Sequence, residues 1–181
     1  MIRQAQQVIG LPLLRKNGKA AGRVLDVWFD EFWRFCGVVL RERLPWPQRD
    51  VRVVRRERIA SWGEDALMLE DGEAVERLDK RQLLRTFHTG VVRLKDMPVY
   101  TVDGQELGRV SDVYFRPNEG KPWIGYELTD GFLADVYEGR RRLLLPEDAE
   151  VVIGEDAILV PASCERMLER NLSGKEQGES V

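Results

Sequence analysis

The sequence predicts an all-β protein with minor helix, organised as two tandem small β-barrels of about six strands each. The prediction depends on an internal repeat, on a hairpin signal in each copy, and on a glycine inside each following strand. Residues 12–30 match residues 98–116 at an offset of 86 positions, and eight of these 19 pairs are identical. Because an internal repeat determines the architecture, the chain is expected to contain the same small domain twice.

The hairpin signal is the dipeptide that follows the first apolar run of each copy. Asn17-Gly18 occupies this place in the first copy and Asp103-Gly104 in the second. Asn-Gly and Asp-Gly between apolar runs are typical of tight hairpin turns, in which both turn residues take positive φ. The sequence therefore predicts a hairpin between strands 11–15 and 20–29, and its repeat in the second copy.

A second glycine lies four residues after each turn glycine, within a segment that otherwise has the composition of a strand. These residues are Gly22 and Gly108. Glycine inside a strand commonly marks a β-bulge or a sharp bend, and such bends allow a sheet to curl until it closes. We therefore expect bulges here and a barrel in each half.

The remaining strands of the first copy are expected at residues 35–40, 51–54, 58–62 and 66–69. The last of them follows Gly-Glu-Asp-Ala at residues 63–66, and the same four residues recur at 154–157. The apolar residues of segment 73–87 recur at helical spacing, which predicts a linker helix, and Cys164 to Leu172 predicts a second short helix. The expected division is 1–72 first barrel, 73–90 helical linker, 91–162 second barrel, and 163–181 short helix and disordered tail.

Composition restricts the class of protein. With 43% hydrophobic and 33% charged residues the chain resembles a soluble globular protein, and no apolar run approaches the roughly 18 residues of a membrane span. The N-terminus lacks the apolar core of a signal peptide, so a cytoplasmic location is expected. The net charge of -3 is uneven, since residues 1–60 carry 13 Lys and Arg against 6 Asp and Glu. This asymmetry suggests a basic face on the first domain.

The order of these motifs resembles that of the PRC-barrel domain: an apolar strand after Pro, an Asn/Asp-Gly turn, Gly-Arg-Val-x-Asp-Val-aromatic-Phe, a strand that contains glycine, and a closing strand after Gly-Glu-Asp-Ala. The resemblance covers residues 8–69 and 92–161. The family includes the cytoplasmic part of the photosynthetic reaction-centre H subunit and the C-terminal domain of the ribosome maturation factor. The resemblance implies an accessory barrel that binds protein or takes part in RNA processing, without catalysis, and this chain looks most similar to the stand-alone tandem type.

Few residues suggest chemistry. Asp26 and Asp112 could form a carboxylate pair, but each occupies the same place in its own copy, so a structural role as hydrogen-bond acceptor is preferred. His88 is the only histidine, which argues against histidine metal sites and Ser-His-Asp triads. Cys36 and Cys164 are interpreted as reduced thiols, the former as a small buried apolar residue. We expect no catalytic, cofactor or metal site.

Arginines with interleaved tryptophans form the most unusual local pattern, at residues 33–58. Such a pattern suits phosphate contact and base stacking, or a protein-interface hot spot. Intervening acids and strand alternation favour instead a solvated, partly salt-bridged surface. If the pattern is a binding surface, its candidate partner-binding residues are Trp33, Arg41, Arg43, Trp46, Arg49 and Arg52.

These observations favour a non-enzymatic cytoplasmic adaptor that binds a protein partner through its barrels. The alternative is an RNA- or ribosome-associated accessory factor that uses the basic first domain. Phosphate binding weakens steeply with salt and apolar docking does not, so salt dependence separates the two hypotheses. Exposed sheet edges also leave a homodimer open.

Overall fold

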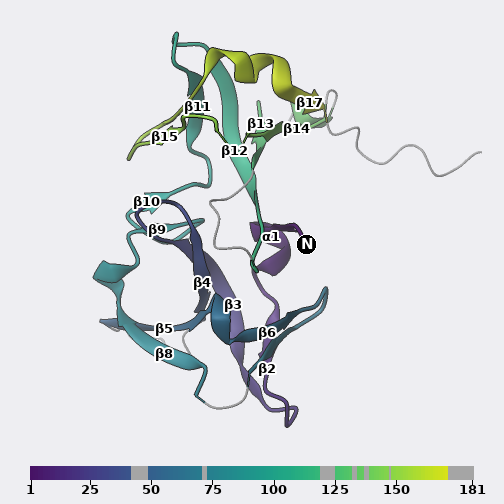
Figure 1. The fold of residues 1–181 in the computed structure, drawn as a ribbon, viewed down its shortest axis with the longest axis vertical. Helices are drawn as coiled ribbons and strands as arrows, with labels where there is room; N and C mark the ends of the chain where they lie inside the picture. Colours follow the sequence, from purple (N-terminus) through teal and green to yellow (C-terminus); the bar gives the residue numbers. More distant parts are fainter. Residues whose placement is uncertain are drawn as a thin grey trace, which may run out of the picture. The chain divides into compact units, whose positions relative to one another are not determined.

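The computed structural model describes residues 1–41, 49–70, 73–118, 125–131, 134–136, 139–146 and 148–170. The chain divides into two compact units. The first comprises Met1–Leu94 with Tyr114–Trp123, and the second comprises Lys95–Val113 with Ile124–Val181. Each unit contains one curved sheet of short antiparallel and parallel strands (Figure 1).

The sheet of the first unit has nine strands in the order β6-β7-β2-β3-β4-β5-β8, with β9 paired to the end of β3 and β10 paired to β9. A four-residue helix, α1 (Ala5–Val8), precedes it, and two 3-10 helices, η1 (Arg56–Arg58) and η2 (Lys80–Gln82), lie in its connections. The strands are β2 (Pro12–Leu14), β3 (Ala20–Phe29), β4 (Phe35–Leu40), β5 (Asp50–Arg55), β6 (Ile59–Trp62), β7 (Leu67–Leu69), β8 (Val75–Asp79), β9 (Arg85–Thr86) and β10 (Val92–Arg93).

The second sheet has eight strands in the order β15-β16-β11-β12-β13-β14-β17. The eighth strand, β1 (Arg3–Gln4), pairs with Tyr114 and Phe115 at the end of β12, and these two residues belong to the first unit. The remaining elements are β11 (Pro98–Thr101), β12 (Glu106–Phe115), β13 (Gly125–Thr129), β14 (Arg141–Leu144), β15 (Val152–Ile153), β16 (Ile158–Val160), the 3-10 helix η3 (Ala162–Met167) and β17 (Leu168–Arg170).

The two sheets have the same strand order. Read along the chain, β6-β7-β2-β3-β4-β5-β8 corresponds strand by strand to β15-β16-β11-β12-β13-β14-β17. In both sheets the first strand of the hairpin also pairs in parallel with the closing strand, as β2 with β7 and β11 with β16. The predicted fold of two tandem barrel-like sheets is therefore confirmed, although each sheet has more strands than the predicted six.

Both predicted hairpins are present, but their turn differs from the expected one. The backbone N–H of Gly18 donates to the carbonyl of Arg15 at 2.8 Å, and Gly104 donates to Thr101 at 2.9 Å. Only the glycine of each turn has positive φ, +78° and +93°. The loops are thus three-residue hairpin loops with a left-handed glycine at the end, and not two-residue turns with two positive φ angles.

The predicted bulges are also present. In the first hairpin the register shifts between Leu13 and Leu14, which pair with Gly22 and Ala20, so Ala21 is the extra residue. In the second hairpin the shift between Val99 and Tyr100 leaves Leu107 as the extra residue. The bulge therefore lies immediately before the glycine in both copies, and it bends the long strand as expected.

The predicted linker helix over residues 73–87 is present only as the three-residue helix η2. Residues on either side form strands β8 and β9, and β8 pairs with β5 at five positions, from Asp50 with Asp79 to Val54 with Val75. The apolar spacing of this segment suited a helix, but pairing along the open edge of β5 satisfies the backbone groups of both strands. Long-range pairing has overridden the local pattern.

The predicted C-terminal helix is shorter than expected and begins earlier. The 3-10 helix η3 covers Ala162–Met167, and its N-cap is Pro161. The following residues form β17, which pairs with β14 as β8 pairs with β5. Strands β8 and β17 therefore cover the free edges of β5 and β14, and the apolar spacing of the sequence predicted neither strand.

Aromatic side chains fill the core of the first unit. The ring of Phe35 stacks on that of Phe115 at a centroid distance of 4.5 Å and meets Trp62 edge-on at 5.5 Å. A second cluster contains Trp28, Val39, Val51, Val53 and Leu83. Trp28 is 7% exposed and packs within this cluster.

Candidate interaction surfaces

Asp26, one of the two repeated acids, is completely buried and supports a neighbouring loop. Its carboxylate accepts hydrogen bonds from the N–H of Val27 at 2.8 Å, of His88 at 2.9 Å and of Thr89 at 2.7 Å, and from the Thr89 hydroxyl at 2.7 Å. Asp112 accepts the same bond from Val113 at 2.8 Å. The predicted structural role of these acids is confirmed, since their oxygens are occupied by backbone donors.

A repeated arginine also supports the fold. The Nη1 of Arg23 donates to the carbonyl of Gly10 at 3.0 Å, and Arg109 donates to the carbonyl of Asp96 at 3.1 Å. Each bond ties the long strand of a sheet to the segment that precedes the hairpin. Arg23 and Arg109 therefore belong to the set of shared residues that hold the barrels in shape.

A second pair of arginines satisfies the carbonyl that each bulge leaves outside the strand ladder. Arg52 donates to the carbonyl of Ala21 at 3.1 Å, and Arg141 donates to the carbonyl of Leu107. Arg52 also donates to the carbonyl of Arg41 at 2.8 Å. The sequence comparison missed this equivalence because loops of different length separate the two arginines from their hairpins.

The predicted partner-binding residues occupy different environments. Trp33 is 8% exposed and lies against the ring of Phe29 and the guanidinium of Arg85. Arg41 and Arg49 are exposed. Arg43 and Trp46 lie outside the described residues. The structure brings together Arg41 and Arg52 through the bond above, and their role in partner binding stays a prediction.

The arginines around β5 are paired with carboxylates. Arg49 lies 3.2 Å from Asp79, Arg55 lies 3.0 Å from Glu76, and Arg56 lies 2.6 Å from Glu57. These pairs are partly exposed, and exposed ion pairs of this kind contribute little to stability. The geometry agrees with the preferred interpretation of a solvated, salt-bridged surface.

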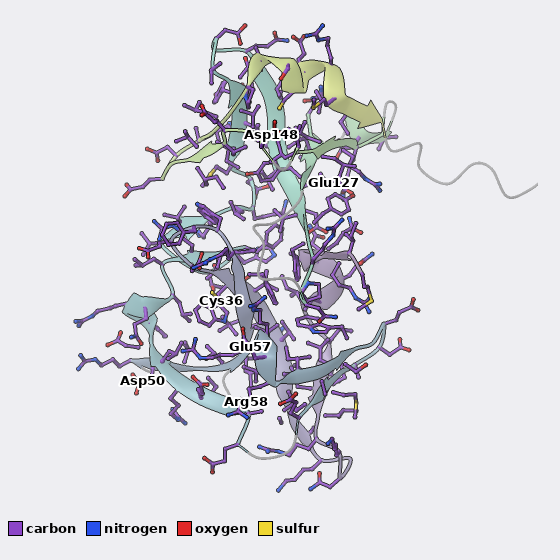
Figure 2. All side chains as sticks on the ribbon, viewed as in Figure 1. Cys36, Asp50, Glu57, Arg58, Glu127 and Asp148 are labelled. Atoms are coloured by element: carbon purple, nitrogen blue, oxygen red, sulfur yellow. The ribbon has the colours of Figure 1, made fainter. Side chains whose placement is uncertain are left out.

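A cavity of about 270 Å³ lies beside Cys36 on β4 and Glu57 on η1, both labelled in Figure 2. Burial, followed by the negative charge of Asp30, raises the pKa of the Cys36 thiol to about 11. The thiol is therefore protonated at neutral pH, and a protonated thiol is a poor nucleophile. The residues that line the cavity are Asp30, Arg34, Phe35, Cys36, Arg55, Arg56 and Glu57.

A buried polar network distinguishes the second sheet. The hydroxyl of Ser111 donates to Glu127 Oε1 at 3.2 Å, and Arg140 donates to the same oxygen at 2.9 Å. Glu127, labelled in Figure 2, is 6% exposed. The hydrogen bond to Glu127 raises the pKa of Arg140. The residues equivalent to Ser111 and Glu127 in the first sheet are Leu25 and Val39. Both are apolar, so the fold does not require the network.

The hairpin tips carry opposite charges in the two copies. The first tip contains half-buried Arg15 and exposed Lys16 and Lys19, and the second contains exposed Asp103 and Glu106. The difference extends to the whole of each unit. Residues 1–94 and 114–123 contain 20 Lys and Arg against 14 Asp and Glu, a net charge of +6, whereas residues 95–113 and 124–181 contain 8 against 17, a net charge of -9.

The outer face of β15, β16 and β11 carries a row of apolar side chains. Val152 pairs with Leu159 across β15 and β16, and Leu159 pairs with Tyr100 across β16 and β11. Val102 continues the same face, and its N–H donates to the carbonyl of Val160 at 2.9 Å. Val102 is 67% exposed, Val152 60% and Leu159 38%. We call Tyr100, Val102, Val152 and Leu159 the apolar row.

Helices of the described segments are all too short or too polar to cross a membrane. Within the same segments no three His, Cys, Asp or Glu side chains are grouped so that they could hold a metal ion. The geometry thus defines a duplicated β-barrel protein in which residues shared by the two copies support the fold.

Residues 90–166 match the family model of the PRC-barrel domain. This segment is therefore a PRC-barrel domain, as the motifs predicted, and the first sheet repeats its strand order. No curated protein matches the chain.

Proposed function

We propose that this chain is a non-enzymatic adaptor of the cytoplasm that binds a protein partner through its barrels. One observation carries the proposal: the side chains shared by the two copies are occupied in folding, while the copies differ in charge and apolarity on their outer surfaces. Asp26, Arg23 and Arg109 all bond to the backbone of their own barrel. A fold kept in duplicate with divergent surfaces is what an interaction module requires, because function belongs to the site and not to the fold.

The cavity beside Cys36 is the place where a catalytic site would be sought. Its composition supports a role without catalysis. Its thiol has a raised pKa, whereas catalytic cysteines have lowered ones. The arginines that line the cavity are held in ion pairs with Asp30, Glu76 and Glu57. Neither feature resembles an activated nucleophile or an oxyanion site.

Affinity capture from native lysate, with and without nuclease, tests the proposal. We expect the intact protein to retain a defined protein that mass spectrometry identifies in both samples. A partner that disappears after nuclease treatment would favour the RNA alternative. Retention of no protein, together with a hit from a small-molecule screen, would contradict the adaptor.

The alternative, an RNA- or ribosome-associated factor, is favoured by the first hairpin. Lys16 and Lys19 are exposed on one tip and Arg15 beside them is half-buried, in a unit whose net charge is +6. Exposed Lys and Arg at a loop tip suit contact with phosphates, and such contact is strongly salt-dependent. Binding of a labelled RNA at several salt concentrations tests it, and a flat salt dependence would contradict it.

A further inference from the structure

The apolar row is an unusual feature for the outer face of a sheet. Along β11, Val99 and Thr101 point inward and are buried, so Tyr100 points outward, and Val102, just after the strand, is exposed. Ile158 and Val160 point inward from β16 in the same way, which leaves Leu159 outside. An outward face in contact with water normally carries polar residues that alternate with the apolar core. A continuous row of four apolar or aromatic side chains therefore requires an explanation.

The duplication supplies a matched comparison for this face. The residues equivalent to Tyr100, Val102, Val152 and Leu159 in the first sheet are Leu14, Lys16, Ser61 and Met68. Two of the four positions are thus polar in the first copy, on strands with the same pairing. The barrel does not need apolar residues at these positions, so the apolar row is a property of the second copy alone.

Acidic side chains surround the apolar row. Asp103 follows Val102, Glu106 pairs across the sheet with Tyr100, and Glu150 lies two residues before Val152. Glu155 and Asp156 occupy the turn between β15 and β16, and all five acids are exposed. On β11, β12, β15, β16 and η3 the exposed cations are Arg109 and Arg166. Arg109 donates a hydrogen bond to the carbonyl of Asp96. The rim is therefore negative.

We propose that the apolar row binds a segment of a partner protein that carries apolar side chains next to Lys or Arg. The inference deepens the proposed function and rests on it. An apolar centre within a charged rim is the arrangement of a protein interface, where the centre contributes most of the affinity and the rim selects the partner. The negative rim, in a unit with a net charge of -9, selects a basic segment.

A second copy of this chain fits the apolar row less well. A two-fold contact places the same patch on both subunits. Such a contact would bring Asp103 and Glu106 of one chain towards the acids of its neighbour, and like charges at an interface are unfavourable. The partner segment is therefore expected to belong to another protein.

The repeat also provides the variant that tests the proposal. Val102→Lys with Val152→Ser places in the second sheet the residues that the first sheet carries at the same positions, so the variant is expected to fold. Lys16→Val with Ser61→Val is the matched control, since it makes the opposite exchange in the first copy. Circular dichroism and the melting temperature establish that both double variants are folded.

The probe is a short fluorescein-labelled peptide in which Lys and Leu alternate. A Lys/Ser peptide of the same charge measures electrostatic attraction without apolar contacts. A Glu/Leu peptide keeps the apolar side chains but carries a charge that the acidic rim repels. We expect the intact protein to bind the Lys/Leu peptide at least about ten-fold more tightly than either twin, and Val102→Lys with Val152→Ser to lose at least about ten-fold in Kd. Amide shifts in a nitrogen-15 NMR spectrum should change at residues 99–106 and 150–160, in the control variant as well.

Four results would overturn the inference: no preference for the Lys/Leu peptide, equal binding by the Val102→Lys with Val152→Ser variant, shifts that map to other strands, or a wild-type dimer that this variant converts to a monomer. The lysate experiment, run with the same variant, separates this proposal from the proposed function. A protein partner retained by both the intact chain and the variant would leave the adaptor standing and exclude the apolar row. If no protein is retained although the peptide binds, the adaptor function is contradicted, while peptide binding by the apolar row is still supported.

Discussion

Buried polar side chains need hydrogen-bond partners within the protein. For the Asp26 carboxylate, most of these partners lie in a loop far along the chain. It accepts hydrogen bonds from the N–H groups of Val27, His88 and Thr89 and from the Thr89 hydroxyl. Residues 88 and 89 are thereby fixed against β3, although more than sixty positions separate them from Asp26. The sequence indicated that Asp26 is structural, but it could not show which backbone groups it satisfies.

Asp26→Asn should therefore destabilise the protein. The amide of asparagine offers one acceptor oxygen where the carboxylate offers two, so buried N–H groups lose their partner. We expect a loss of about 2–3 kcal/mol in the free energy of unfolding, measured by urea denaturation. Asp103→Asn, at an exposed position of the second hairpin, is the control and should change stability by less than about 0.5 kcal/mol. Equal stability of the two variants would show that the loop is held by other contacts.

Cys36 should react slowly at neutral pH. Because burial and Asp30 raise its thiol pKa to about 11, from the ordinary value of 9.0, the folded protein holds about a hundred-fold less thiolate than the unfolded chain below pH 9. The rate of alkylation by iodoacetamide, measured on a Cys164→Ala variant, should continue to rise to about pH 11. The raised pKa favours the folded state below pH 9.0, and this contribution is lost as the pH rises towards 11. A rate that levels off near pH 9 would contradict the raised pKa.

At the scale of the elements, close approach of backbones explains why strands β4 and β13 each contain a glycine. A Cβ atom on Gly37 would lie 2.2 Å from the carbonyl oxygen of Val54, and one on Gly125 would lie 2.6 Å from that of Leu143. The obstacle is backbone of the neighbouring strand in both cases, so it cannot rotate away. The two glycines hold equivalent places in the two sheets, as the alignment of the copies indicated.

Gly37→Ala should consequently cost more than about 3 kcal/mol of folding free energy, and Gly125→Ala a similar amount, because β4 and β5 or β13 and β14 have to separate. Gly104→Ala is the control. Its φ is +93° and a Cβ atom there meets nothing within 4 Å, so only the left-handed conformation is penalised, by about 1 kcal/mol. Thermal and urea denaturation measure all three. A Gly37→Ala protein as stable as Gly104→Ala would mean that the two strands are more widely spaced than the structure has them.

Elements with local sequence signals could be predicted, and strands that depend on long-range pairing could not. Hairpins, bulges and the strands between residues 11 and 69 were predicted because turn glycines and apolar runs are local signals. Strands β8 and β17 were predicted as helices because their only reason to be extended is the open edge of β5 or β14, which lies far away in the sequence. The roles of Arg52 and Arg141 were missed for the same reason, since the bulge carbonyl that each satisfies is visible only after pairing.

At the scale of the whole molecule, the duplication separates what the fold needs from what it does not. The uneven charge was visible in the sequence, and the structure assigns +6 to one unit and -9 to the other. The apolar row was not predicted, because its members are four ordinary residues on three strands that become neighbours only through the pairing of β15, β16 and β11. Two copies of one barrel with opposite charge are suited to two different surfaces of a partner or to two partners.

That division of charge yields a prediction for the intact chain. If the basic hairpin contacts phosphates, replacement of Arg15, Lys16 and Lys19 by Gln should weaken binding of a single-stranded RNA and reduce the slope of log K against log salt by about 2, at roughly 0.7 per phosphate contact. If the protein partner docks on the apolar row of the acidic copy, its capture should be unaffected by the same three changes. Fluorescence anisotropy with labelled RNA and quantitative mass spectrometry of the captured partner measure the two effects on one protein. Loss of the protein partner in the triple variant, with RNA binding unchanged, would reverse the assignment and place partner recognition on the basic copy.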